Sequence, residues 1–155
     1  MRKNFEPVIV AFCCWHCSYA AADLAGMSRI QYPTNVRIIR VPCTGRVDLL
    51  HIFKALVEGA DGVIIAGCLK GQCHYVDGNL KAELRVEFAK RILKGIGVEP
   101  ERVEMFFVSA AMGAELVTLF KEFVERIRRL GPNPVKLRRH GQGTMPAKVR
   151  TQRSR

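Results

Sequence analysis

The sequence of 155 residues lacks an apolar run long enough to cross a membrane. Its longest apolar stretches have the length of a strand, whereas a membrane helix needs roughly 20 apolar residues in succession. The first residues also lack the apolar core of a secretion signal, since Arg2 and Lys3 are soon followed by Glu6 and Pro7. We therefore expect a cytoplasmic protein that folds as one domain, because a chain of this length can bury a sizeable core.

Acidic residues are missing from the last 25 positions. Residues 131–155 hold seven lysines and arginines, whereas residues 1–130 hold 18 basic and 14 acidic side chains, so most of the formal net charge of +11 comes from the C-terminal segment. This segment is rich in glycine, proline and polar residues and has too few apolar residues to fold alone. We predict a single domain over residues 1–131 and a basic, flexible tail over residues 132–155. A tail that docks on an acidic partner protein is an alternative, whereas nucleic-acid binding is not favoured because no recognition motif is present.

The sequence has no glycine-rich phosphate-binding motif after any expected strand. It also has no paired acid and base, and no nucleophile with a base beside it. The sequence therefore gives no evidence for nucleotide binding or for acid–base or nucleophilic catalysis. We expect a non-catalytic role.

Hydrophobic periodicity predicts four strands and four helices in strict alternation. The expected strands cover residues 8–14, 36–41, 61–68 and 102–110, and the expected helices begin at Ser18, Val47, about Leu80 and about Ala111. In the third helix apolar residues recur every four positions on one face, and the last helix carries a stripe for burial. The set in the third helix is Leu80, Leu84, Phe88, Ile92 and Ile96. The set in the last helix is Leu116, Leu119, Phe120, Phe123, Ile127 and Leu130. Strict alternation predicts an α/β fold with an open, doubly wound parallel sheet of four strands, flavodoxin-like or Rossmann-like, in the order 2-1-3-4.

Six cysteines stand out in so short a chain. In a reducing compartment such a number points to metal or redox chemistry more than to disulfide bonds. Five of them lie at or just beyond the carboxyl end of a predicted strand, and the sixth follows three positions after the first strand. Because the carboxyl ends of parallel strands meet at one edge of the sheet, we expect these thiols to approach one another. They are Cys13, Cys14, Cys17, Cys43, Cys68 and Cys73.

Three kinds of thiol chemistry fit this pattern to different degrees. Structural zinc usually takes two close C-x-x-C pairs, and only Cys14 and Cys17 have that spacing. Dithiol exchange at Cys14 and Cys17 in a thioredoxin-like enzyme would leave the other cysteines without a role. A 2Fe-2S cluster takes four thiolates, often from separate segments, so the spacing favours it. Zinc, dithiol exchange and unliganded core cysteines remain alternatives.

Three stretches carry a resemblance to a known family: "FCCWHCSYAAADLAG", "QYPTNVRIIRVPCTGRVD" and "GADGVIIAGCLKGQCHYVDGN". Together they resemble the delta, or iron-sulfur, subunit of methyl-viologen-reducing hydrogenase over about residues 8–131. The resemblance implies a 2Fe-2S electron carrier of methanogenesis and electron bifurcation. Such a carrier would link a hydrogenase or formate dehydrogenase module to the flavin-bearing A-type flavoprotein of heterodisulfide reductase.

The same resemblance implies a set of cluster ligands. It places the family's cysteines at Cys14, Cys17, Cys43, Cys68 and Cys73, and it leaves Cys13 outside the set. We expect Cys14, Cys43, Cys68 and Cys73 to be the ligands because they lie nearest the strand ends, with Cys17 as the alternative ligand.

Several residues near these cysteines are candidates for supporting roles. Arg46 and His74 are candidates for a place beside the cluster. Trp15 either shields the site or contacts a partner, and the stretch from Asp77 to Asn79 reads as a turn and helix cap. The chain departs from the family pattern at Trp15, His16, Leu69 and Gln72, which leaves the electron donor open.

Overall fold

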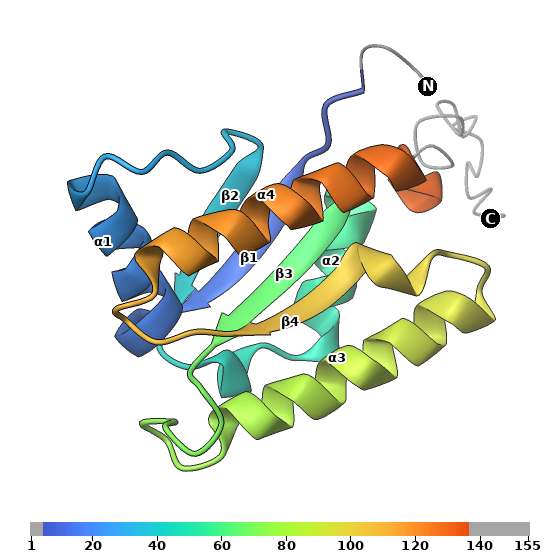
Figure 1. Cartoon of the computed structure of the whole chain (residues 1–155). Helices are drawn as coiled ribbons and strands as arrows, with labels where there is room; N and C mark the ends of the chain where they lie inside the picture. Colours follow the sequence, from blue (N-terminus) through green and yellow to red (C-terminus); the bar gives the residue numbers. More distant parts are fainter. Residues whose placement is uncertain (1–4, 137–155) are drawn as a thin grey trace, which may run out of the picture.

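Four parallel strands form one sheet in the order β2-β1-β3-β4 (Figure 1). This arrangement comes from a computed structural model that describes residues 5–136. The strands are β1 (Ile9–Cys14), β2 (Val36–Val41), β3 (Gly62–Gly67) and β4 (Val103–Phe107). The two central strands are buried almost throughout, which explains why their sequences are apolar at successive positions. The predicted strand order is confirmed.

Helices cover both faces of the sheet. They are α1 (Ala20–Met27), α2 (Leu49–Glu58), α3 (Gly78–Gly95) and α4 (Gly113–Leu130). Figure 1 shows α4 crossing in front of the strands and α2 behind them. One core layer joins α1 and α4 to the sheet, and a second joins α2 and α3 to its other face. The doubly wound α/β fold predicted from the sequence is therefore confirmed.

The last helix buries the predicted stripe, whereas the third helix does not. In α4, Phe120, Phe123 and Ile127 are fully buried. In α3, by contrast, Leu84 is 64% exposed and Phe88 is 48% exposed, and the buried face carries mostly smaller side chains. This face includes Ala82, Val86, Ala89 and Leu93. Small residues let the helix approach the sheet closely, and the larger apolar residues that recur every four positions lie mostly on the exposed side of α3.

The first strand runs directly into a helical segment. A π-helical turn, η1 (Trp15–Tyr19), follows Cys14 at once and continues into α1. Ser18, which was expected to begin the helix, lies inside this turn and is buried. Its hydroxyl donates a hydrogen bond to the carbonyl of Ala66 at 2.6 Å, so it ties the turn to β3. The helical segment therefore begins at Trp15, three residues before the expected start at Ser18.

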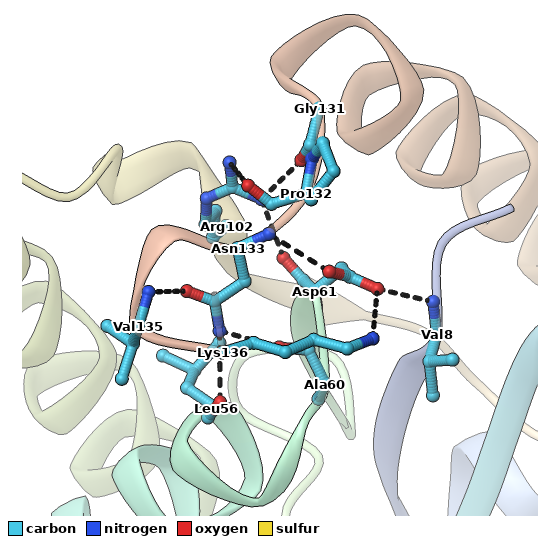
Figure 2. Close-up of polar contacts among 10 residues, drawn as sticks. All are labelled: Val8, Leu56, Ala60, Asp61, Arg102, Gly131, Pro132, Asn133, Val135 and Lys136. Carbon is cyan, nitrogen blue, oxygen red and sulfur yellow. Dashed lines mark hydrogen bonds and ion pairs between the residues drawn. The ribbon is translucent and has the colours of Figure 1, made fainter. Parts of the chain in front are cut away.

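A buried polar network closes the opposite, amino edge of the sheet (Figure 2). The carboxylate of Asp61 accepts hydrogen bonds from the backbone N–H groups of Val8, at 2.9 Å, and Asn133, at 3.0 Å. The fully buried guanidinium of Arg102 donates to the backbone carbonyls of Asp61, Gly131 and Pro132. These contacts join the start of β1, the start of β3 and the segment that follows α4.

The same network includes the first residues of the predicted tail. Asn133 is fully buried, and its side-chain amide donates to the carbonyls of Leu56 and Ala60 at 2.9 and 2.8 Å. Lys136 lies 3.5 Å from the Asp61 carboxylate. The remainder of the predicted tail, residues 137–155, lies outside the described residues, and the domain boundary at residue 131 stays a prediction.

Within residues 5–136, no helix is long and apolar enough to span a membrane.

Candidate metal centre

Five of the six cysteines gather at the carboxyl edge of the sheet. Cys14 ends β1 and Cys17 lies in the turn that follows it. Cys43 comes after β2, just before the short 3-10 helix η2 (Thr44–Arg46), while Cys68 follows β3 and Cys73 lies in the loop before α3. The topology thus brings together side chains that are up to 59 positions apart in the sequence.

Three of these thiols form a buried group. The sulfur atoms of Cys14, Cys17 and Cys68 all lie within 4.8 Å of one another. The Sγ atoms of Cys14 and Cys68 are 3.8 Å apart. Cys17 joins the group because the chain turns into a helix immediately after Cys14, which brings position 17 back over the strand end.

The other two thiols form a pair beside this group. The Sγ atoms of Cys43 and Cys73 are 3.9 Å apart. Cys14 links the two groups, since its Sγ lies 3.8 Å from the carbonyl oxygen of Pro42, the residue before Cys43. Cys43 is buried, whereas Cys73 is the least buried of the five. The pair therefore lies on the solvent side of the site.

Two glycines allow the Cys43 segment to approach α3. A Cβ atom at Gly78 would lie 2.4 Å from the Cys43 sulfur, and one at Gly45 would lie 2.8 Å from the Cα of Gly78. Contacts this short are sterically impossible for a side chain, so both positions need glycine. Arg85 of α3 reinforces the approach, because its guanidinium donates to the carbonyls of Gly45 and Val47 at 2.6 and 3.0 Å.

Asn79 holds the Cys68 segment against the start of α3. Its buried side-chain amide donates to the carbonyls of Cys68 and Leu69 at 2.8 and 3.1 Å. Helix α3 does begin at Gly78, after Asp77, as the turn-and-cap interpretation expected. The side chain of Asp77 makes no capping hydrogen bond, however, and Asn79 acts on the cysteine loop instead.

Sequence reasoning missed the supporting roles of Ser18, Gly78, Asn79 and Arg85. The Gly-Asn pair at the start of a helix, five positions beyond Cys73, was a usable signal for a close approach. Arg85 gave no such signal, because its acceptors are backbone carbonyls about 40 positions away.

The environment of the buried thiols favours one thiolate among them. The Cys17 thiol donates toward Cys14 and, despite the opposing effect of burial, lowers the pKa of Cys14 to about 5. The same contact, together with burial, raises the pKa of Cys17 above its ordinary value. Burial also raises the pKa of Cys68.

In the Cys43 and Cys73 pair, likewise, the pKa of one thiol is raised and that of the other is lowered. Burial is the main cause that raises the pKa of Cys43 to about 11. Burial also acts on Cys73, but the backbone N–H groups of Tyr75 and Asn79 outweigh it and hold the pKa of Cys73 below its ordinary value. In each group the pKa of one thiol is therefore lowered toward the thiolate, which is the form of cysteine that binds metals.

Cys13 belongs to the core and not to the site. It points to the face of the sheet that α1 and α4 cover, where it is fully buried. Burial raises its pKa to about 12, so this sulfur remains a protonated thiol. Cys13 is thus a core residue, apart from the five cysteines that gather at the carboxyl edge.

Arg46 and His74 lie at the surface around the site. Within residues 5–136, neither side chain donates a hydrogen bond to a cysteine sulfur. The imidazole of His74 stacks on that of His16, with 4.1 Å between ring centroids. The backbone N–H of His74, rather than its ring, favours the thiolate form of Cys68.

The donor set fits a metal centre held by thiolates. Two sulfurs bound to one tetrahedral ion at about 2.3 Å lie about 3.8 Å apart. The Cys14 and Cys68 sulfurs and the Cys43 and Cys73 sulfurs have separations of 3.8 and 3.9 Å, which match this value. Soft sulfur donors of this kind suit zinc and iron-sulfur clusters.

Comparison with known proteins places the sequence among hydrogenase subunits. The family described as "Methyl-viologen-reducing hydrogenase, delta subunit" matches residues 9–131. The iron-sulfur subunit of the F420-non-reducing hydrogenase vhu of Methanopyrus kandleri is 56% identical over 127 residues, which are 82% of this chain and 96% of that protein. Its counterpart in Methanocaldococcus jannaschii is 51% identical over 131 residues, which are 84% of this chain and 98% of that protein.

A longer relative contains the same domain as one part. The A-type subunit of the ferredoxin/F(420)H(2)-dependent CoB-CoM heterodisulfide reductase of Methanosarcina acetivorans is 48% identical over 131 residues. The match covers 84% of this chain but 16% of that protein. A domain like this one therefore occurs both as a separate chain and within a longer polypeptide.

Proposed function

Since the chain belongs to the methyl-viologen-reducing hydrogenase delta subunit family, we propose that it is an electron-transfer subunit with one 2Fe-2S cluster. The cluster would be held at the carboxyl edge of the sheet by four of the five gathered cysteines. When bound, such a cluster accepts and returns one electron at a time. The chain itself would hold the cluster and limit the access of water to it.

The pairing of four sulfurs carries this proposal. Cys14 and Cys68 form one pair and Cys43 and Cys73 form the other, each with the separation of two ligands on one tetrahedral ion. Two adjoining pairs supply the two ligands that each iron of a 2Fe-2S cluster needs. Cys17, within 4.8 Å of both Cys14 and Cys68, is the alternative ligand for that side.

The polar residues around the site would fix the positions of the cysteine-bearing segments. Ser18, Asn79 and Arg85 each bond to a backbone carbonyl of a cysteine-bearing segment or of the strand beside it. They would keep the five sulfurs in place before the cluster is inserted. Arg46, exposed beside Cys43, would contribute positive charge near the cluster.

We further propose that electrons pass between a hydrogenase or formate dehydrogenase module and a flavoprotein like the A-type subunit of heterodisulfide reductase. The relatives named as hydrogenase iron-sulfur subunits support the first side of this transfer. The relatives named as A-type subunits of heterodisulfide reductases, which contain a domain like this chain, support the second side.

Metal and sulfide analysis of the chain, purified without oxygen, tests the proposed cofactor. We expect two iron atoms and two acid-labile sulfides per chain, and one unpaired electron after reduction by one equivalent. Zinc without sulfide would contradict the proposal. A colourless protein that reduces disulfides through Cys14 and Cys17 alone would contradict it as well.

A further inference from the structure

Aromatic side chains are exposed directly over the cysteine site. We define the aromatic face as Trp15, His16, His74, Tyr75 and Val76. Trp15 and Tyr75 are each 54% exposed. The ring of His16 stacks on that of His74 and makes an edge contact with that of Tyr75. The ring centroids of His16 and Tyr75 are 5.9 Å apart. The aromatic face therefore joins the turn after Cys14 to the loop that holds Cys73.

Val76 occupies a strained backbone position within this face. Its φ angle is +68°, in the left-handed region that β-branched residues rarely adopt. Its side chain is 87% exposed, so within the described chain no packing compensates for the strain. Strained residues of this kind often occur at functional sites. Contact with another molecule would give this apolar side chain the burial that the free chain does not provide.

Positive charge borders the aromatic face. The guanidinium of Arg40 lies over the Trp15 ring, 4.2 Å from its centroid. Arg46, together with Tyr75 and Cys43, lines a hollow of about 330 Å³. In the part of the chain that the structure describes, neither arginine has an ion pair. The nearby carboxylate of Asp77 is paired with Lys81 at 3.1 Å.

We infer that the aromatic face is the docking surface for an acidic surface of a protein like the A-type subunit of heterodisulfide reductase. Tyrosine, tryptophan and arginine are the residues that most often dominate binding energy at interfaces, and unpaired arginines favour an acidic partner. The relatives indicate this partner, because a domain like this one is also part of longer A-type subunits. This inference rests on the proposed electron transfer, which requires the two redox centres to lie close together.

Two variants within the face and one outside it test the assignment. Val76→Asp places an acidic side chain in the face, and aspartate tolerates the left-handed backbone. Tyr75→Ala removes an exposed ring. Leu84→Asp is the matched control, since Leu84 is 64% exposed on α3 outside the aromatic face. Binding of each cluster-loaded chain to the A-type subunit of the same organism is measured by calorimetry, together with the rate of electron transfer to that protein.

We expect Val76→Asp and Tyr75→Ala to weaken binding about tenfold or more, and Leu84→Asp to bind like the unchanged chain. Iron content, sulfide content and reduction by a small dye should be unchanged in all three. Equal binding of the two face variants and the unchanged chain would overturn the inference. So would an equal loss of binding in Leu84→Asp. Failure of the proposed function is seen separately, as an absence of iron and sulfide from the unchanged chain.

Two charge-reversing variants test whether the partner's surface is acidic. Arg40→Glu should weaken binding to the A-type subunit about tenfold, whereas Lys94→Glu, at the far end of α3, should not. Binding of the unchanged chain should also weaken as salt is raised from about 50 to about 500 mM. Binding that is insensitive to both changes would overturn the assignment of an acidic partner.

Discussion

Gly78 lies so close to Cys43 that a Cβ atom on the glycine would come within 2.4 Å of the cysteine sulfur. The first residue of α3 is thus part of the cysteine site, although it has no side chain. The position of the Cys43 sulfur depends on the absence of a methyl group.

Gly78→Ala should therefore displace Cys43 and reduce the amount of bound cluster. We expect the iron and sulfide content to fall by more than half, while the far-ultraviolet circular dichroism of the fold is retained. Gly95→Ala is the matched control, since it lies in the same helix and has no atom within 4 Å of its Cβ position. It should keep the full cluster and be equally or slightly more stable. Full iron content in Gly78→Ala would show that the site does not need this close approach.

Single cysteine variants should separate the ligands from the other thiols. Serine at Cys43, Cys68 or Cys73 should remove most of the iron and sulfide, because each loss leaves one iron with a single thiolate ligand in place of two. Cys13→Ala should retain both, because Cys13 is buried in the core on the other face of the sheet.

The choice between Cys14 and Cys17 follows from the same measurement. We expect Cys14→Ser to lose the cluster and Cys17→Ser to keep it. The reverse result would make Cys17 the ligand. Visible absorption and iron content, compared with the unchanged chain, give the answer.

Arg85→Met should loosen the segment that holds Cys43. The substitution removes two hydrogen bonds from a charged donor to the carbonyls of Gly45 and Val47, and one such bond contributes about 1.5 to 3 kcal/mol. We expect faster loss of iron to a chelator and a lower midpoint of unfolding in urea. Arg91→Met, on the exposed side of the same helix, should change neither. Equal rates of iron loss in the two variants would contradict the role of Arg85.

Arg102→Met should destabilise the fold without changing the cysteine site. Arg102 is fully buried and bonds to three backbone carbonyls at the amino edge of the sheet, so its removal leaves those acceptors without partners. We expect a loss of about 3 kcal/mol in the free energy of unfolding, measured in urea. Arg129→Met, exposed on α4, should change it little. The iron content of folded Arg102→Met should equal that of the unchanged chain.

Glu104 should make stability depend on pH. Burial opposes ionisation, but Lys90 and Arg126, at 2.8 and 2.7 Å, outweigh it and hold the pKa of Glu104 below its ordinary value of 4.5. Its contribution is therefore present above pH 4.5 and is lost as the pH falls through the lower pKa of the folded state. The stability difference between the unchanged chain and Glu104→Gln should be largest near neutral pH and shrink in acid. A constant difference for Glu104→Gln would contradict the assignment.

The sequence predicted the sheet better than the surfaces of its helices. The central strands are buried on both faces, so their apolar runs predict buried strands even when the elements that pack against them are unknown. The parallel topology then brings Cys14, Cys43 and Cys68 to one edge. The periodic stripe of α3 does not identify its buried face, because most of its large apolar residues lie on the exposed side of this helix, while alanines and valine lie against the sheet.

The finer structure of the site could not be derived from spacing. The grouping of Cys17 with Cys14 and Cys68 depends on a π-helical turn directly after β1, which no local pattern indicated. The pairing of Cys43 with Cys73 depends on Gly78 and on the bonds from Arg85 to a segment about 40 positions earlier. Both are long-range relationships, and one sequence contains no direct record of them.

The buried network around Asp61 also makes the two edges of the sheet different in function (Figure 2). It anchors Asn133 and Lys136 at the amino edge of the sheet, whereas the cysteines lie at the carboxyl edge, a strand length of roughly 20 Å away. A linker attached after Lys136 would therefore start on the side opposite the thiols. On an electrode, a chain immobilised through such a linker would present its cysteine edge to the solution, where soluble redox partners could reach it.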